Sequence, residues 1–171
     1  EIDISIHSLK DLPHRLPKGL KLAGYLRRDD HRDALVSNEN NTILKLKKNS
    51  IIGTSSIRRE IQLRKIRPDL KIKLIRGNIV TRINKMFKGK YDGILLAMAG
   101  LKRLSITKNV KPIKIKYFVP AVGQGTIAIV TRKNDRYVNQ IINSLSHKKT
   151  RIEVTCERAF LKGIDGSCQT P

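Results

Sequence analysis

Residues 50–96 repeat an order of strand, turn and helix, and this repeat restricts the possible folds more than any other feature of the chain. Short apolar or alternating runs at residues 51–53, 70–74 and 94–96 are typical of strands, and the stretches between them have apolar residues at helical spacing. Strands joined through helices pair in parallel, because the crossover returns the chain to the same end of the sheet. The sequence therefore predicts an α/β fold with mainly parallel strands covered by helices.

The two helices between these strands have recognisable ends. The hydroxyls of residues 54–56 can cap the first helix, Glu60 and Arg64 are spaced for an i,i+4 ion pair, and Pro68 ends it. A turn at residues 76–78 precedes the second helix. The residues expected to face the core are Ile57, Ile61 and Ile66 in the first helix and Val80, Ile83 and Phe87 in the second.

Further elements are expected on both sides of this repeat. Alternation over residues 2–6 predicts a strand with one buried face, and residues 20–26 and 127–131 also read as strands. The charged run 27–33 is expected to be a solvated crossover between domains, and the basic stretch 107–116 to be solvated. One predicted helix has an apolar face made of Val138, Ile141, Ile142 and Leu145. A capping box at residues 150–153 predicts the start of another helix, whose expected inward residues are Ile152, Cys156, Ala159 and Phe160.

The chain is strongly basic. It has 36 Lys and Arg against 14 Asp and Glu, which gives a formal net charge of +22. Three interpretations fit this charge: a Lys-rich composition bias, phosphate contacts with nucleic acid, or a site for a polyanionic small molecule. A base-stacking platform is poorly supplied, because aromatic residues are 4% of the chain and there is no Trp.

Other sequence signals limit the class of protein. No apolar run approaches the roughly 18 residues of a membrane span, and the opening residues have no signal-peptide pattern. Because the chain starts without Met inside a strand pattern, we expect further sequence before Glu1 and after Pro171. Two cysteines without a CxxC or a His/Cys cluster favour a reducing compartment and argue against a disulfide framework or a metal site.

Basic residues follow the predicted strands where open α/β sheets bind ligands, beyond the carboxyl ends of the strands. Arg58 and Arg59 lie in the segment GTSSIRR, and Arg76 and Arg82 lie in RGNIVTR. Free N–H groups at a helix N-terminus, the helix dipole and Arg forks together favour anions. These residues predict a site for carboxylates or phosphates, and the alternative for each arginine is a solvated surface position.

Two further residues could carry chemistry. Asp11, in HSLKD, is the acid nearest this basic edge, and it is either a turn cap or a buried carboxylate that handles a proton. Cys168 lies in a Gly-Ser loop and is either a small buried hydrophobe or a nucleophile or covalent anchor. Cys156 is expected to be a core residue and His7 a structural one.

Six ordered segments together resemble the porphobilinogen deaminase (hydroxymethylbilane synthase) family: HSLKDLP, GTSSIRR, RGNIVTR, YDGILLAMAGLKRL, VPAVGQG and ERAFLKGIDGSCQTP. The resemblance implies a transferase of tetrapyrrole (haem) biosynthesis that condenses four porphobilinogen molecules head to tail. Ammonia is lost at each step, and the product is the linear tetrapyrrole hydroxymethylbilane. It also implies a dipyrromethane cofactor attached to Cys168 by a thioether.

The resemblance assigns roles residue by residue. Asp11 takes the catalytic carboxylate position, with Lys10 beside it. The positions that bind acetate and propionate groups of cofactor and substrate fall on Ser56, Arg58, Arg59, Arg76 and Arg82, with Arg103 and Gln124 as weaker matches. Ser167 stands where the family commonly has Gly, and Ile79-Val80 where it often has Val-Gly.

The resemblance further implies a fragment of an enzyme with three α/β domains, the first two like periplasmic binding proteins. Residues 1–27 and 125–145 would belong to the first domain, residues 32–119 to the second, and residues 148–171 to the start of the third. A cytoplasmic monomer that binds porphobilinogen, without nucleic-acid or membrane partners, is expected. The fragment is not expected to be active by itself, and the alternative function is a non-catalytic α/β binding module for an anionic small molecule.

Overall fold

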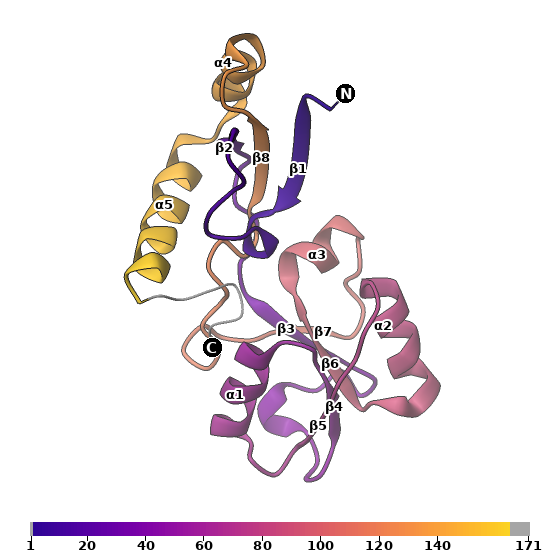
Figure 1. Ribbon diagram of the computed structural model, residues 1–171. Helices are drawn as coiled ribbons and strands as arrows, with labels where there is room; N and C mark the ends of the chain where they lie inside the picture. Colours follow the sequence, from indigo (N-terminus) through magenta and orange to yellow (C-terminus); the bar gives the residue numbers. More distant parts are fainter. Residues whose placement is uncertain (1, 165–171) are drawn as a thin grey trace. The chain divides into compact units, whose positions relative to one another are not determined.

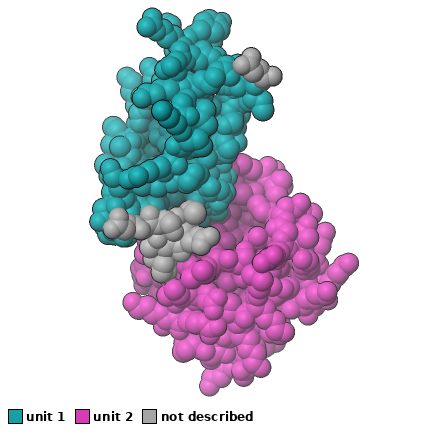
Figure 2. Space-filling view, viewed as in Figure 1, with its two compact units in different colours: residues 1–31, 121–168 teal, residues 32–120, 169–171 magenta. Residues whose placement is uncertain are grey.

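The computed structural model describes residues 2–164 and divides them into two compact units (Figure 1). Unit 1 contains residues 2–31 and 121–164, and unit 2 contains Arg32–Pro120; Figure 2 colours the two units separately. The chain therefore leaves unit 1 after His31 and returns to it at Ala121.

Unit 2 is built on a five-stranded sheet in the order β5-β4-β6-β3-β7. Its strands are β3 (Asp33–Ser37), β4 (Ile51–Gly53), β5 (Lys71–Lys73), β6 (Gly93–Ala97) and β7 (Val110–Pro112). β4 pairs in parallel with β5 and β6, which confirms the predicted repeat, whereas β3 runs antiparallel to both β6 and β7. Mainly parallel pairing thus holds for the part of the sheet whose strands are joined through helices.

Helices cover both faces of this sheet: α1 (Ile57–Ile66), α2 (Ile79–Lys85) and α3 (Met98–Arg103). Alternate residues of a strand point to opposite faces, so Leu35 and Leu95 join one buried cluster with Leu63 of α1. Ala34 and Leu96 join the other cluster, which includes residues of α2 and α3. Two apolar layers therefore stabilise unit 2 on its own.

Several residues predicted to face the core of unit 2 are exposed. Ile57, Ile61, Val80 and Phe87 are between 48% and 56% accessible, and Leu74 is also exposed. Ile83 is buried as expected, and Ile66 is partly buried against the core. In α1 the inward face carries Arg59, Leu63 and Ile66, because a buried acid described below holds the arginine inside. Most of the stretch 107–116 is exposed as expected, although it contains β7 and the buried Ile113.

Unit 1 is built on a three-stranded antiparallel sheet in the order β1-β8-β2, where a parallel sheet was expected. Its strands are β1 (Ile4–Ser8), β2 (Leu20–Tyr25) and β8 (Ile127–Arg132). Ile129 packs with Ile142 of α4 (Arg136–Leu145), and Val130 packs with Val154 of α5 (Lys148–Gly163). The two helices therefore contact residues from alternate positions of β8.

Four expectations for unit 1 differ from the structure. Ile2, Ile4 and Ile6 are exposed: β1 is an edge strand, and α4 packs on Ile129 and Ala23 of the neighbouring strands β8 and β2. In α5, Val154 and Thr150 are buried, whereas Ile152, Cys156, Ala159 and Phe160 are exposed. The cap of α5 is His147 rather than Thr150, because the His147 ring nitrogen Nδ1 accepts a hydrogen bond from the backbone N–H of Thr150 at 3.2 Å. In α4, Ile141 and Leu145 are also exposed.

Candidate ligand-binding and catalytic residues

The first candidate segment of unit 2 lies between β4 and α1. Ser56 is the N-cap of α1, and its hydroxyl accepts a hydrogen bond from the backbone N–H of Arg59 at 3.4 Å. Ser56 is half-buried, and its hydroxyl proton can still be donated outward. The cap therefore places one hydroxyl, next to free N–H groups of the first helical turn, at the carboxyl end of a parallel strand.

Arg58 and Arg59 are held inside unit 2 by Asp33. The Asp33 carboxylate is completely buried, and it lies 2.8 Å from the Nη2 atoms of both arginines. Arg59 also donates to the Leu95 carbonyl at 2.9 Å, and Arg58 donates to the Val119 carbonyl. The alternative of solvated surface positions is therefore wrong for these two arginines, which use much of their donor capacity within the unit.

Burial sets the electrostatics of this cluster. The pKa of Arg58 is lowered mainly because burial disfavours its charged form, and Asp33 opposes this shift. One carboxylate faces two guanidinium groups, so the cluster retains a net positive charge. A buried excess of positive charge favours a nearby anion, because the local dielectric is low.

Arg82 belongs to the same electrostatic neighbourhood. Its pKa is lowered mainly by burial and then by the positive charge of Arg59. Arg82 donates from Nε to the Gly77 carbonyl at 2.7 Å, and Asn78 caps α2 by accepting from the backbone N–H of Thr81 at 2.8 Å. The structure therefore brings Arg59 and Arg82 close enough to repel each other, and an anion between them would relieve that repulsion.

Arg76 and Arg103 are more loosely placed. Arg76 is exposed just before α2, where its carbonyl accepts from Lys85 Nζ at 2.9 Å. Arg103 is exposed at the last position of α3. Within residues 2–164, neither guanidinium group makes a hydrogen bond or ion pair, so both are available to a ligand and neither is fixed by the protein.

In unit 1, Lys10 and Asp11 lie in a 3-10 turn, Leu9–Asp11, that follows β1. Leu9 is buried and donates its N–H to the Thr126 carbonyl at 3.0 Å, which ties the turn to the start of β8. Asp11 is exposed rather than buried, and in the described part of the chain its carboxylate caps no backbone N–H. The turn is therefore fixed while the carboxylate at its end stays accessible.

Gln124 contacts the segment where the chain leaves unit 1, near His31. It is 1% exposed, its side-chain Nε2 donates to the His31 carbonyl at 2.8 Å, and its own carbonyl accepts from Arg28 Nε at 3.0 Å. Arg28 in turn pairs with Glu157 of α5. The adjacent Gly125 has a φ of +86°, and a Cβ there would lie 2.7 Å from the Asp29 carbonyl oxygen. These contacts give Gln124 a structural role.

Cys168 lies outside the described residues, so the structure gives no account of its position. Cys156, expected to be a core residue, is an exposed free thiol on α5 because the buried side of that helix carries Val154. Among residues 2–164, no group of three or more His, Cys, Asp or Glu side chains is placed to hold a metal ion. No helix in the same range has the length and apolar character needed to cross a membrane.

Asp33 is the residue that sequence reasoning missed. It closes the charged run 27–33, and that run was interpreted as a solvated crossover. A signal was present, because Asp33 directly precedes the apolar residues 34–36, which form the middle of β3. Its burial could not be read from the chain, because the two arginines that neutralise it follow more than 20 residues later.

Comparisons with known proteins give the family of this chain. The sequence model described as "Porphobilinogen deaminase, dipyromethane cofactor binding domain" matches residues 1–140. The porphobilinogen deaminase of Sulfurimonas denitrificans is 47% identical over 174 residues, which cover 100% of this chain and 55% of that protein. The chain thus spans about half the length of this curated relative.

Solved structures of binding proteins are similar at a lower level. The substrate-binding protein of an amino acid ABC transporter has 16% identity and a TM-score of 0.46, over 94% of this chain and 69% of that one. An ancestral arginine-binding protein bound to glutamine has 18% identity and a TM-score of 0.43, over 81% and 62% of the two chains. The family match covers most of the chain and the deaminase similarity covers all of it. The chain belongs to the porphobilinogen deaminase family.

Proposed function

We propose that this chain supplies the cofactor-holding and proton-handling residues of a porphobilinogen deaminase, a transferase that joins four porphobilinogen molecules into hydroxymethylbilane. The observation that carries the proposal is that Ser56 and Arg59, at the start of α1, and Arg82, in α2, follow the carboxyl ends of the parallel strands β4 and β5. Porphobilinogen carries two carboxylates, so a growing chain of pyrroles becomes a polyanion. Guanidinium forks bind carboxylates through paired charge-assisted hydrogen bonds.

The residues of unit 2 fit the carboxylates of a dipyrromethane. Arg82 forms no ion pair with a described residue, Ser56 can donate its hydroxyl proton, and the Arg76 guanidinium is exposed. These side chains would hold the acetate and propionate groups, with Arg58 supporting Arg59 through Asp33. When bound, the cofactor supplies a pyrrole with a free α-carbon, to which the first substrate unit is added. We assign its covalent attachment to Cys168.

Asp11 is the proposed catalytic carboxylate. As ammonia leaves porphobilinogen, positive charge develops on the substrate pyrrole, and an accessible carboxylate can accept its N–H and offset that charge. The same carboxylate can take up the α-proton that is lost once the new carbon–carbon bond has formed. Lys10, the neighbouring residue, is assigned to the same group, and Arg103 is a further candidate for carboxylate binding. For Gln124 we propose that it fixes the crossing rather than binds a ligand.

We further propose the domain boundaries expected from the family. Residues 1–27 and 125–145 are assigned to the first domain, 32–119 to the second and 148–171 to the start of the third. The structure divides into two compact units, and the chain passes from one to the other after His31 and back at Ala121. This division supports the first two assignments. The α5 helix packs within unit 1, so the assignment of residues 148–171 to a further domain rests on the family pattern alone.

The experiment uses a chimera of full family length. Residues 1–171 replace the matched segment of the Sulfurimonas denitrificans deaminase, and porphobilinogen consumption and intact protein mass are measured. We expect the chimera to consume porphobilinogen and to carry a dipyrromethane adduct. Cys168→Ser should lose the adduct, whereas Cys156→Ser, which removes an exposed thiol, should keep it.

Two results would contradict the proposal. An adduct that persists in Cys168→Ser would exclude that attachment site. In chimera already carrying cofactor, Asp11→Asn should slow formation of the first enzyme–substrate adduct by roughly 100-fold or more, and Asp11→Glu by less. An Asp11→Asn rate close to the parent's would exclude the catalytic role. A folded chimera that binds porphobilinogen without consuming it would favour the alternative, a non-catalytic anion-binding module.

A further inference from the structure

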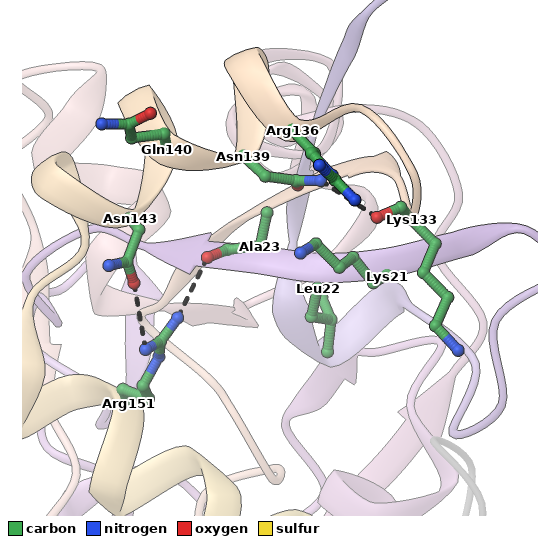
Figure 3. Close-up of a pocket in the computed structure, with 9 residues that line it drawn as sticks. All are labelled: Lys21, Leu22, Ala23, Lys133, Arg136, Asn139, Gln140, Asn143 and Arg151. Carbon is green, nitrogen blue, oxygen red and sulfur yellow. Dashed lines mark hydrogen bonds between the residues drawn. The ribbon is translucent and has the colours of Figure 1, made fainter.

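Unit 1 contains a pocket of about 410 Å³ between β2, the turn before α4, α4 itself and the start of α5 (Figure 3). Its volume is within the range of small-molecule sites. None of Lys10, Asp11 and Gln124, the unit 1 residues discussed above, lines it. The pocket is therefore separate from the residues of unit 1 proposed for catalysis.

The lining of this pocket is strongly cationic. Four of the lining residues are basic, namely Lys21, Lys133, Arg136 and Arg151, and none of the lining residues is acidic. A second pocket of unit 1, of about 510 Å³, differs in this respect because Asp29, Glu153 and Glu157 line it beside the arginines. Charge in the second pocket is neutralised by the protein, whereas charge in the first is not.

Arg151 is fixed in place at one side of the pocket. Its guanidinium donates to the Asn143 side-chain oxygen at 3.3 Å and to the Ala23 carbonyl at 3.1 Å, as Figure 3 shows. Both acceptors are neutral, so the positive charge of Arg151 is oriented but not cancelled. A guanidinium held in this way loses little conformational entropy when it binds an anion.

The turn before α4 is fixed in a similar way. Asn139 donates to the carbonyls of Arg132 at 3.1 Å and Lys133 at 3.2 Å, which ties α4 to the end of β8. The side chains of Lys21, Lys133 and Arg136 form no hydrogen bond or ion pair with any of the residues that the structure describes. Three unpaired cations over one concave surface repel one another, and a multivalent anion bound between them would be attracted to all three.

We propose that this pocket binds a small anion with two or more negative oxygen-containing groups, either phosphates or carboxylates. The backbone of the site is set by Asn139 and Arg151, and its unpaired charge comes from Lys21, Lys133 and Arg136. This binding is a property of unit 1 alone and does not depend on the proposed reaction.

The test titrates the 171-residue protein separately with pyrophosphate and with tricarballylate, a tricarboxylate, at constant ionic strength. Because the arginines of unit 2 are also proposed to bind anions, backbone amide NMR shifts of residues 133–143 report on this pocket specifically. The proposal predicts saturable shifts at these amides with at least one of the two anions. The response to each anion then distinguishes phosphate from carboxylate recognition.

Matched variants separate a built site from general attraction to a basic protein. Lys133→Ala with Arg136→Ala should weaken binding at least tenfold. Lys18→Ala with Lys148→Ala removes the same charge from exposed positions of unit 1 outside the pocket, and binding should change less than twofold. Equal weakening by both pairs, or shifts that do not saturate with either anion, would overturn the proposal.

Discussion

Asp33, completely buried at the start of β3, lies 2.8 Å from guanidinium nitrogens of both Arg58 and Arg59. A buried carboxylate is costly unless its charge is matched; Arg59 Nε donates a hydrogen bond to Asp33 Oδ1 at 3.0 Å, and Arg58 forms an ion pair with Oδ2. Both arginine side chains are already ordered by these contacts, which would reduce the entropy lost on binding the ligand proposed above. One acid missed in the sequence thus determines how two predicted ligand residues are held.

The first prediction concerns Asp33→Asn. The variant keeps the shape but leaves two buried guanidinium groups without a counter-charge, so we expect a loss of about 3–5 kcal/mol in the free energy of unfolding. Urea denaturation measures it. The control is Glu60→Gln, which breaks an exposed i,i+4 pair with Arg64 and should cost about 0.3–0.5 kcal/mol. Equal losses in the two variants would contradict the central role of Asp33.

The second prediction concerns Asp69 and pH. Hydrogen bonds from Arg67 at 2.6 and 2.8 Å lower the pKa of the Asp69 carboxyl below its ordinary value. Because the pKa is lowered in the folded state, the contribution to stability is complete above the unfolded pKa and is lost as pH falls through the folded pKa. We expect the unfolding free energy of Asp69→Asn to fall less steeply than wild type below about pH 4. NMR titration should show the Asp69 pKa rising in Arg67→Gln, and an unchanged value would contradict the assignment.

At the scale of elements, the helix N-termini decide where the candidate ligand residues lie. α1 begins after Ser56 and α2 after Asn78, and each cap side chain accepts the backbone N–H of the third helical residue, Arg59 and Thr81 respectively. Both helices follow parallel strands, so both caps lie at the carboxyl edge of one sheet. Each cap fixes where its helix starts, and so sets the positions of Arg59 in α1 and of Arg82 in α2 relative to that edge.

The third prediction tests the cap of α2. Asn78→Ala removes the acceptor for the Thr81 N–H, and we expect a loss of about 1 kcal/mol in the free energy of unfolding. Asn84→Ala is the control, because Asn84 is exposed within the same helix and Ala is the better helix former there. Thermal unfolding of both variants makes the comparison. A larger loss in Asn84→Ala would show that the cap does not fix the start of α2.

At the scale of the whole molecule, one folded unit is not a continuous segment of the chain. Unit 1 is assembled from two segments that are separated in sequence by all of unit 2. Unit 2 is a continuous segment with two buried clusters of its own, and its first and last strands in the chain, β3 and β7, pair with each other. A continuous segment with its own core has the features of an independently folding domain.

The fourth prediction follows from this organisation. Residues 32–120 expressed alone should fold, because they retain Asp33, its two arginines and the Val119 carbonyl that Arg58 contacts. Dispersed amide NMR signals and a single cooperative unfolding transition are the expected results. The same fragment carrying Asp33→Asn serves as a destabilised reference. Collapsed spectra for the unmodified fragment would show that unit 2 depends on unit 1.

The sequence by itself determined the repeat of strands and helices over residues 50–96, the capping of α1, the Glu60–Arg64 pair and the membership of a family. These features depend on neighbours within a few residues or on ordered motifs, and both are visible in a linear chain. The inward faces of α1, α2 and α5 were misassigned, because periodicity gives an apolar stripe but not the surface that will cover it.

Only the tertiary structure decided the remaining features. β3 pairs antiparallel with β6, and Asp33 is buried against Arg58 and Arg59. The Gln124 side chain donates a hydrogen bond to the His31 carbonyl. Four cations surround one pocket of unit 1 although they come from positions as far apart as Lys21 and Arg151. Each of these outcomes depends on partners that are remote in sequence. The cost of burying a charge or a polar group is set by those partners, and they are known only after the chain has folded.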